Sequence, residues 1–220
     1  MPHAIVTGAN RGIGLQLCLA LKDRGYRVTA LCRQRGDLPA AVGIEIQENY
    51  DVTDGAAIEA FARSVEPGTV DLLINNAGIL RSTSLDNLDL ASARQQFEIN
   101  ALGPLRVTQS LLPALKDGGK IALVRSRMGS IADNDSGGSY GYRMSKAALN
   151  AAGMSLARDL HERGIAVAIL HPGYVRTDMT GQSGLIDTDE SVDGMLERID
   201  ELNLSNSGSF WHTNGELLPW

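Results

Sequence analysis

The segment GSYGYRMSKAALN, residues 138–150, holds a tyrosine and a lysine at a spacing suited to proton transfer. Tyr142 and Lys146 are four residues apart, so on a helix they would share one face with their Cβ atoms about 5–6 Å apart. An ammonium group beside a phenol favours the phenolate and lowers the phenol's pKa from about 10. Tyr140 lacks this partner because Met144 follows it at that distance. The spacing predicts Tyr142 as a proton donor, although such a pair also arises by chance and needs support from the rest of the chain.

A second candidate site is the segment TGANRGIG, residues 7–14, which joins an apolar run to a helical pattern. Backbone N–H groups of a glycine-rich turn, together with a helix N-terminus, can hold a pyrophosphate. The spacing is G-x-x-x-G-x-G rather than the commoner G-x-G-x-x-G, and any tight turn between a strand and a helix can use glycine. We interpret the segment as a dinucleotide-binding turn formed by Gly8, Asn10, Arg11, Gly12, Ile13 and Gly14.

The elements that must position these two segments alternate between strand and helix about seven times. Apolar runs predict strands at residues 3–8, 26–32, 44–52, 70–78, 120–126 and 165–173. Helical spacing predicts helices at about 13–25, 54–65, 90–115 and 142–164, the third bent near Gly103 and Pro104. The stretch ending at Val42 is poorly patterned, and the segment Thr180–Asp189 is the best candidate for a mobile loop or lid.

Several of these strands are apolar on both faces, as in a parallel sheet that helices cover on both sides. The sequence therefore predicts an α/β fold with a single-domain doubly wound parallel sheet, a Rossmann fold, over residues 1–220. Ligands of such a sheet bind at the carboxyl ends of the strands, where the strand order reverses. The glycine turn is expected at that edge.

Composition narrows the classes of partner. The chain has 220 residues, 43% of them hydrophobic, which suits one domain with a substantial core. A net charge of −6 without a long basic run argues against nucleic acid or an anionic membrane surface as partner. No leader pattern and no apolar run of about 18 residues is present, so we expect a cytoplasmic protein.

The cysteines and histidines give no sign of a metal site or a disulfide framework. Cys18 and Cys32 stand alone in apolar surroundings, and we interpret both as structural residues. The four histidines are scattered without the spacing of metal ligands, so no metal is expected.

Four motifs follow one another in a single order: TGANRGIG, NNAG at residues 75–78, YRMSK at 142–146 and HPGYVRTDM at 171–179. Because these motifs occur in this order, the chain resembles the short-chain dehydrogenase/reductase family over essentially its whole length. Within the family, GSI, GGSYGYRMSKAALNAA and the ending GELLPW are similar to the C-factor-like and sniffer-type carbonyl reductases. The resemblance implies reduction of a carbonyl group with NADPH, or the reverse oxidation of an alcohol.

The resemblance also implies roles for the residues around Tyr142. Ser126 would orient the substrate carbonyl, Asn100 would hold a water that passes protons toward Lys146, and Lys146 would also hold the nicotinamide ribose. The serine assignment has an alternative, Ser130, because the family's usual gap from serine to tyrosine lies between the two positions. Arg125 departs from the small or hydroxylated residues that are commoner before this serine.

The preferred cofactor depends on the end of the second strand, where an acidic residue would repel a 2′-phosphate. Here Cys32 is followed by Arg33, and Arg11 adds a second guanidinium that could bind a phosphate. We therefore expect NADP(H). The resemblance implies further cofactor contacts from Asp51, Val52, Asn76, Ala77, Gly78, Pro172, Gly173, Val175 and Thr177.

Two functions remain open at this point. The first is an NADPH-dependent reductase of aldehydes, ketones or quinones, a small-molecule enzyme with Tyr142 as donor. The second is a regulatory protein of C-factor type that binds the dinucleotide without significant turnover. Small residues at 147, 148 and 151–153 favour close helix packing, and relatives commonly assemble through this helix, so we expect a homodimer or a tetramer. Phe210, Trp211 and Trp220 are expected in the core or an interface.

Overall fold

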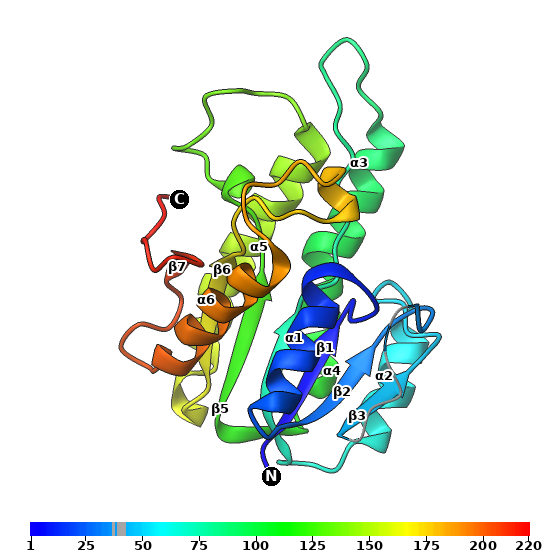
Figure 1. Ribbon diagram of the computed structural model, residues 1–220, viewed down its shortest axis with the longest axis vertical. Helices are drawn as coiled ribbons and strands as arrows, with labels where there is room; N and C mark the ends of the chain where they lie inside the picture. The colour runs from blue at the N-terminus through cyan, green and yellow to red at the C-terminus, as the bar shows by residue number, and fades with distance from the viewer. Residues whose placement is uncertain (37, 39–42) are drawn as a thin grey trace.

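The computed structural model describes residues 1–36, 38 and 43–220, and part of the poorly patterned stretch ending at Val42 lies outside them. Over the described residues, seven parallel strands form one sheet in the order β3-β2-β1-β4-β5-β6-β7 (Figure 1). The strands are β1 (His3–Thr7), β2 (Arg27–Leu31), β3 (Ile44–Gln47), β4 (Val70–Asn75), β5 (Leu115–Val124), β6 (Ala166–His171) and β7 (Phe210–His212). The predicted doubly wound α/β fold is confirmed.

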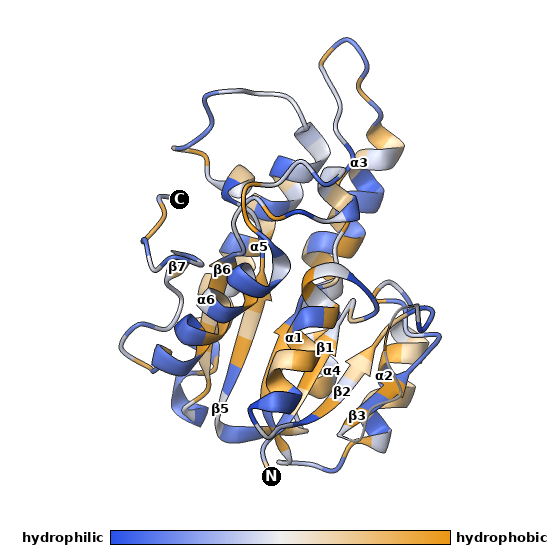
Figure 2. Ribbon diagram, viewed as in Figure 1, coloured by the Kyte–Doolittle hydropathy of each residue, from blue (hydrophilic) through white to orange (hydrophobic). Residues whose placement is uncertain are grey.

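Helices cover both faces of this sheet. They are α1 (Gly12–Asp23), α2 (Gly55–Ser64), α3 (Leu90–Phe97), α4 (Gly103–Leu111), α5 (Tyr140–Asp159) and α6 (Thr188–Glu201). One core cluster joins α1 and α6 to one face of the sheet, and a second joins α2, α4 and α5 to the other. The strands between them are largely apolar, while the exposed sides of α1 and α6 carry hydrophilic residues (Figure 2).

The first strand of the chain, β1, lies in the middle of the sheet, and its position determines where a ligand-binding crevice can form. β1 pairs with β2 on one side and with β4 on the other, so the strand order reverses between β1 and β4. The turns that leave these two strands start at Gly8 and Asn76. The predicted glycine turn therefore lies at the switch point of the sheet.

Several strands and helices begin or end at other residues than predicted, and local features of the chain explain the differences. Strand β3 ends at Gln47 rather than at residue 52, and Asn49 with φ of 59° turns the chain there. The predicted helix 90–115 is divided by a π-helical turn, Glu98–Leu102, and ends at Leu111. Pro113 lies two residues after that end, and it has no backbone N–H with which to continue the hydrogen bonds of the helix. Helix α5 starts at Tyr140 and ends at Asp159.

Two elements of the C-terminal part went unpredicted. Helix α6 has apolar residues at helical spacing, Val192, Met195, Leu196 and Ile199, and all four are buried. Strand β7 has three residues and pairs with β6 at the edge of the sheet. Phe210 and Trp211 are buried, as expected, whereas Trp220 is 46% exposed and packs its ring on Phe210.

Candidate active site

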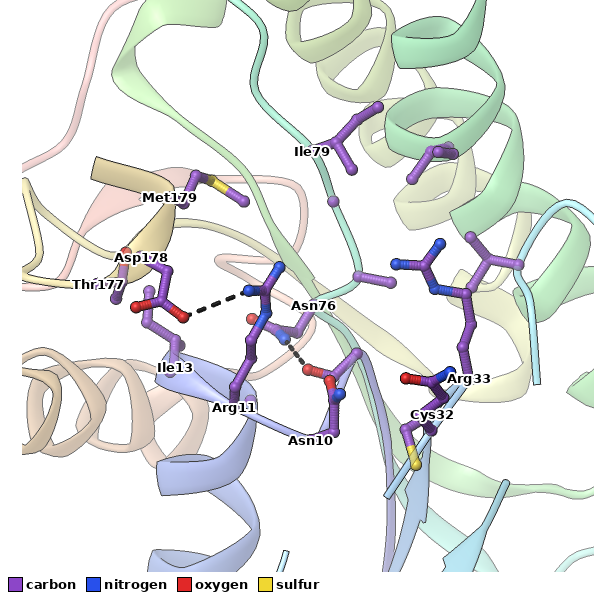
Figure 3. A pocket seen from close by; sticks show the side chains of 18 of the residues that line it. Asn10, Arg11, Ile13, Cys32, Arg33, Asn76, Ile79, Thr177, Asp178 and Met179 are labelled. Carbon is purple, nitrogen blue, oxygen red and sulfur yellow. Dashed lines mark hydrogen bonds and ion pairs between the residues drawn. The ribbon is translucent and has the colours of Figure 1, made fainter. Parts of the chain in front are cut away.

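A cleft of about 550 Å³ lies at the carboxyl ends of the central strands (Figure 3). It is lined by the glycine turn, by the ends of β2 and β4 and by the loop after β6. The predicted cofactor residues among its lining are Gly8, Asn10, Arg11, Gly12, Ile13, Gly14, Arg33, Asp51, Val52, Asn76, Ala77, Gly78 and Thr177. Predicted residues from distant parts of the sequence are thus brought to one cleft.

The glycine turn packs so closely that side chains are excluded at two positions. Gly8 has φ of +63°, and a Cβ there would lie 2.7 Å from the Cα of Ala77. A Cβ on Gly14 would collide with the carbonyl of Gly8 and would lie 2.5 Å from Nδ2 of Asn76. Glycine is required at both positions, since a larger residue would push the turn away from the end of β4.

Thr7 and Asn76 fasten the turn to the end of β4. The backbone N–H groups of Asn76 and Ala77 donate to Oγ1 of Thr7, at 3.0 and 3.1 Å. In return, Nδ2 of Asn76 donates to the carbonyls of Thr7 and Gly8, both at 3.1 Å. Asn76 therefore supports the turn through its backbone and its side chain together.

The N-terminus of α1 carries donors that suit an anion. Its N-cap residue, Arg11, makes no side-chain capping hydrogen bond, and no acidic residue lies in the first turn. Gly12, Ile13 and Gly14 of that turn line the cleft. The first N–H groups of a helix have no partner within the helix and attract negative charge. A dinucleotide pyrophosphate fits this end of the cleft.

Arg11 and Arg33 lie at different parts of the rim. Nη1 of Arg11 is paired with Oδ2 of Asp178 at 3.3 Å, and Figure 3 shows the guanidinium turned toward that carboxylate. Both side chains of the pair are more than 60% exposed. Arg33 follows Cys32 at the end of β2 and is exposed beside the cleft. Of the two arginines expected to bind a phosphate, Arg11 pairs instead with a carboxylate here.

Asp51 and Val52 border the side of the cleft next to β2. Oδ1 of Asp51 accepts from the N–H and the hydroxyl of Thr53, at 2.9 and 2.8 Å, which fixes the carboxylate. Val52 is buried against Gly103, where a Cβ would lie 2.9 Å from Cγ2 of the valine. This contact joins the cleft wall to the start of α4.

Tyr142 and Lys146 lie one helical turn apart on α5, as the spacing predicted. Both are buried, with 6% and 4% of their surface exposed. The start of α5 is held by Gly141, where a Cβ would lie 2.7 Å from the Cα of Ala93 on α3. Ser139, just before the helix, has left-handed φ and ψ of 46° and 42°. A close helix contact and an unusual backbone conformation therefore position Tyr142.

The amine of Lys146 lies behind the cleft wall. Its Nζ donates to the carbonyl of Val124 at 3.2 Å and is 5.7 Å from the centre of the Tyr142 ring. A Cβ built on Gly78, which lines the cleft, would be 3.5 Å from this Nζ. Burial and the neighbouring charge of Arg125 lower the pKa of Lys146 to about 7.

The acidity of Tyr142 differs from the prediction. Burial raises its pKa above the ordinary value, while Ser126 and the charge of Arg125 act to lower it. Burial outweighs the groups that lower it, so the pKa of Tyr142 lies above its ordinary value and not below it as expected. The charged side chain that acts on the phenol is Arg125.

The two candidate serines occupy different surroundings. Ser126 follows β5, accepts from the N–H of Met128 at 3.2 Å and lies close enough to Tyr142 to act on its pKa. Ser130 is buried, and its hydroxyl accepts from the N–H of Asp133 at 3.1 Å. Ser126 is therefore the serine beside Tyr142 and Ser130 stabilises a turn, while the role of Ser126 toward a carbonyl stays a prediction.

Asn100 lies fully buried in the π-helical turn between α3 and α4. Its side chain accepts from the N–H of Ile79 at 2.8 Å and donates to the carbonyl of Ile79 at 2.9 Å. Nδ2 also donates to the hydroxyl of Ser145 on α5 at 3.0 Å. Asn100 thus ties the loop after β4 to α5, while its expected role with a proton-carrying water stays a prediction.

The segment after β6 holds Pro172, Gly173, Val175 and Thr177. The carbonyl of Pro172 accepts from the hydroxyl of Ser191 on α6 at 2.5 Å. Thr213, after β7, donates its backbone N–H to His171 at 2.9 Å and its hydroxyl to the carbonyl of Ser191 at 2.7 Å. Of the four predicted residues only Thr177 lines the cleft described above. The unpredicted C-terminal elements therefore hold this segment in place.

The predicted lid, Thr180–Asp189, folds back on the same segment. The hydroxyl of Thr180 donates to the carbonyl of Val175 at 2.7 Å, and the N–H of Arg176 donates to Ile186 at 2.9 Å. A side chain at Gly184 would collide with Val175 and Arg176. The segment thus forms a hydrogen-bonded loop at the rim, and its mobility stays a prediction.

Some cleft residues escaped the sequence reasoning. The lining also includes Cys32, Gln34, Tyr50, Ile79, Ile99, Arg176, Asp178, Met179 and Gln182. Most of them lie one or two positions from a predicted residue in the sequence. Their nearness to a motif is therefore the feature that could have identified them. Cys18 and Cys32 are buried free thiols, as expected for structural cysteines.

The described residues contain neither a cluster of metal-ligating side chains nor a membrane-spanning helix. Within that part of the chain, no three His, Cys, Asp or Glu side chains are grouped in a way that could hold a metal ion. None of the helices there has the length and hydropathy to cross a membrane.

Comparison with known proteins assigns the family. The profile described as short chain dehydrogenase matches residues 2–185. The chain belongs to the short-chain dehydrogenase family. It is 40% identical to 1-hydroxy-2-glutathionyl-2-methyl-3-butene dehydrogenase of Rhodococcus sp. (strain AD45), with all of both chains covered. It is 49% identical to the C-signal protein of Myxococcus xanthus, over 74% of this chain and all of that protein.

Solved structures of this family agree with the fold. The carbonyl reductase Sniffer of D. melanogaster superposes with a TM-score of 0.94 at 30% identity, covering all of both chains. The NADPH-bound carbonyl reductase from chicken fatty liver superposes with a TM-score of 0.89 at 32% identity, covering all of this chain and 99% of that one. The resemblance to sniffer-type carbonyl reductases is confirmed. The protein is an oxidoreductase of the short-chain dehydrogenase family with a nicotinamide dinucleotide as cofactor.

Proposed function

We propose that this short-chain dehydrogenase reduces an aldehyde, ketone or quinone with NADPH and that Tyr142 is the proton donor. One observation carries the proposal: Tyr142, Ser126 and Lys146 lie together at the end of β5 and the start of α5, behind the wall of the dinucleotide cleft. Both carbonyl reductases that superpose on the chain support the same reaction class.

The preference for NADPH over NADH is part of the proposal. Arg33 lies at the end of β2, where an acidic residue would select against a 2′-phosphate, and its guanidinium is exposed at the cleft. The neighbouring residue Cys32 carries no charge that would repel a phosphate. The NADPH bound to the chicken reductase supports this choice.

Different residues would bind the cofactor and react with the substrate. A bound dinucleotide would supply the hydride. The first turn of α1 would hold its pyrophosphate, Asp51 and Val52 would border its adenine, and Pro172 to Thr177 would meet its nicotinamide end. Ser126 would donate a hydrogen bond to the substrate carbonyl, and Tyr142 would transfer its phenolic proton to that oxygen.

A carbonyl panel tests the proposed function. The purified protein is incubated with NADPH or NADH and a set of aldehydes, ketones and quinones, and oxidation of the dinucleotide is followed by absorbance. We expect NADPH oxidation with at least one carbonyl and slower oxidation of NADH. NADPH binding in a titration without oxidation by any substrate class would contradict the reductase.

A second function has its own support. The 49% identity to the C-signal protein, which covers the whole of that protein, favours a regulatory dinucleotide-binding protein. The same panel separates the two proposals, since a regulatory protein binds NADPH without turnover. Oxidation of a glutathione-linked alcohol, as the name of the Rhodococcus relative suggests, is tested by adding such alcohols with NADP⁺.

A homodimer is the proposed assembly. Ala151 on α5 is exposed, while Gly153 packs against Leu123 and Ile169 of its own sheet. One side of the small-residue stripe therefore serves the monomer and the other is free for a second copy. Light scattering measures the assembly, and a monomeric mass at micromolar concentration would contradict it.

A further inference from the structure

Ser126 is flanked on both sides by parts of the chain that contact the segment Phe210–Trp220, which contains β7. Arg125 precedes it directly, and the loop of residues 127–139 leads from it to α5. The segment itself lies outside the residues that the proposed reaction uses. Its end, marked C in Figure 1, lies beside the loop. The contacts of the segment therefore bear on where Ser126 is placed.

The side chain of Arg125 packs on β7. Its Cζ lies 3.7 Å from the centre of the Phe210 ring, within the range of a cation–π contact. A Cβ on Gly129 would collide with Nη2 of Arg125, so the guanidinium is confined on that side as well. Arg125 is 2% exposed, and within the described part of the chain its side-chain nitrogens have no hydrogen-bond partner. The ring of Phe210 is therefore the favourable contact that the described residues offer this buried cation.

Phe210 also packs against Trp220. Their ring centres are 5.6 Å apart, with the planes tilted by 31°, a separation at which aromatic pairs attract each other. The chain between the two rings forms a hairpin. The N–H of Leu218 donates to the carbonyl of Phe210 at 2.9 Å, and the N–H of His212 donates to the carbonyl of Glu216 at 2.8 Å. The ring contact and the hairpin together fix Trp220 relative to Phe210.

The backbone of Trp220 holds the loop after Ser126. Its carbonyl accepts from the N–H of Ala132 at 2.8 Å. The next residue, Asp133, donates its N–H to Oγ of Ser130 at 3.1 Å, and Ser130 donates its N–H to the carbonyl of Arg127 at 2.9 Å. The contact at Ala132 is thus connected to the start of the loop by short-range hydrogen bonds.

Ser126 itself begins the first turn of this loop. It is the N-cap of the 3₁₀ turn Arg127–Gly129, and its Oγ accepts from the N–H of Met128 at 3.2 Å. Its carbonyl accepts from the N–H of the third residue of the turn at 2.9 Å. The orientation of the Ser126 hydroxyl is therefore tied to the placement of the turn.

These contacts form a closed circuit around Ser126. It runs from Ser126 along the loop to Ala132, across to Trp220, then through Phe210 to Arg125, which is bonded covalently to Ser126. Residues 210–220 therefore restrain both neighbours of Ser126 from one side of the molecule.

We propose that Trp220 is a positioning residue, which together with Phe210 fixes the turn that carries Ser126 and so holds its hydroxyl ready for a substrate carbonyl. This rests on the proposed function, in which Ser126 donates a hydrogen bond to that carbonyl. Trp220 acts through Ser126, and a small displacement of an orienting group lowers the rate strongly.

Hydrogen exchange tests the positioning without a substrate. The amides of Ala132 and Met128 mark the two ends of the path, because one donates to Trp220 and the other to Ser126. In Trp220→Ala both amides should exchange about threefold to tenfold faster, as expected when one hydrogen bond is weakened. The amide of Asn76, which donates to Thr7 in the glycine turn, should keep its wild-type rate.

Matched variants show whether the ring of Trp220 is responsible. Trp220→Phe keeps an aromatic ring for Phe210 and should restore slow exchange. Leu217→Ala removes an apolar side chain of the same segment that is 65% exposed, and it should leave both amides unchanged. Should Trp220→Ala fail to fold, Trp220→Leu removes the ring and keeps the apolar bulk.

A double-mutant cycle tests whether this positioning serves the reaction. With a carbonyl that the protein reduces, Trp220→Ala should lower kcat/KM by about tenfold to a hundredfold and leave the Kd for NADPH unchanged. In a Ser126→Ala background the same change should have almost no further effect, because the group that it positions is gone. A merely structural role would lower kcat/KM by the same factor in both backgrounds.

The two measurements separate this inference from the proposed function. If no carbonyl is reduced, the reductase falls, and hydrogen exchange alone decides whether Trp220 fixes the turn of Ser126. Arg143 on α5 also fastens the loop, since its Nη1 donates to the carbonyl of Met128 at 3.2 Å. If that bond suffices, Met128 and Ala132 exchange at wild-type rates in folded Trp220→Ala, and this outcome overturns the proposal, as do equal factors in the cycle.

Discussion

The cleft at the glycine turn and the corner where β5 meets α5 differ in how their charged groups are placed. In the cleft, the tightly packed turn around Gly8 and Gly14 and the first residues of α1 form the lining, and the charged side chains of Arg11 and Asp178 at the rim are exposed. At the corner of β5 and α5, Tyr142, Lys146 and Arg125 are buried and their pKa values shift. Changes in the cleft should alter affinity, whereas changes at the corner should alter rate and pH dependence.

Among the variants that test this difference between cleft and corner, Tyr142→Phe is expected to have the largest effect on kcat. Loss of the phenolic proton should lower kcat by about 10²–10⁴-fold, the usual contribution of general acid catalysis, and leave NADPH affinity unchanged because the ring remains. Steady-state kinetics and a binding titration measure the two quantities. Tyr140→Phe is the matched control, since Tyr140 is 37% exposed and should keep full activity. A normal kcat for Tyr142→Phe would remove this residue from its role.

Arg33→Asp tests the rim of the cleft. A carboxylate there should repel the 2′-phosphate and lower the NADPH to NADH ratio of kcat/KM by about tenfold to a hundredfold, since a hydrogen bond to a charged group contributes about 1.5–3 kcal/mol. Arg35→Asp is the control, because Arg35 bonds Leu38 and does not line the cleft. An unchanged ratio would show that another group recognises the phosphate.

Gly14→Ala tests the backbone packing of the turn. The added methyl would meet Gly8 and Asn76, so the turn must move and the Kd for NADPH should rise by about tenfold, or about 1.4 kcal/mol. Gly55→Ala adds the same methyl at the start of α2, where no atom lies within 4 Å, and should leave the Kd unchanged. Equal affinities of the two variants would contradict the importance of this packing.

The smallest effect is expected from Asp178→Asn. Exposed ion pairs contribute about 0–1 kcal/mol, so freeing Arg11 from this carboxylate should raise NADPH affinity by no more than about fivefold and leave NADH affinity unchanged. Parallel titrations with both dinucleotides measure the difference. A gain for both cofactors alike would mean that Arg11 does not reach the 2′-phosphate.

Local patterns were enough to predict much of this fold. The strands from β1 to β6 are apolar runs bounded by turn residues, and α1 and α5 follow helical spacing from Ile13 and Tyr142 onward. Helix α6 was missed although its apolar residues repeat correctly, because the segment before it reads as an irregular polar loop. Strand β7 is too short for a pattern and exists through its pairing with β6.

The residues of the site also fall into those that local patterns predict and those whose placement depends on distant parts of the chain. Tyr142, Lys146 and the glycine turn are short-range motifs, so their spacing made them candidates, and the order of the four motifs along the chain supported them. The support for Pro172 comes from Ser191 and Thr213, and the pKa of Tyr142 depends on Arg125, all at larger sequence distances. Whether a lysine keeps its charge depends on burial, which a motif does not contain. The sequence therefore predicted which groups lie together, but not how burial shifts their pKa values.

The hydrogen bond from Thr213 to His171 has a consequence for the order in which the protein matures on the ribosome. The glycine turn and the Tyr142 helix emerge early, but the segment after His171 rests on α6 and on residues that follow β7. A nascent chain that has emerged only as far as residue 187 would contain the segment after His171 but lack α6 and β7, which hold it in place. This part of the cleft rim is therefore the last to gain its support.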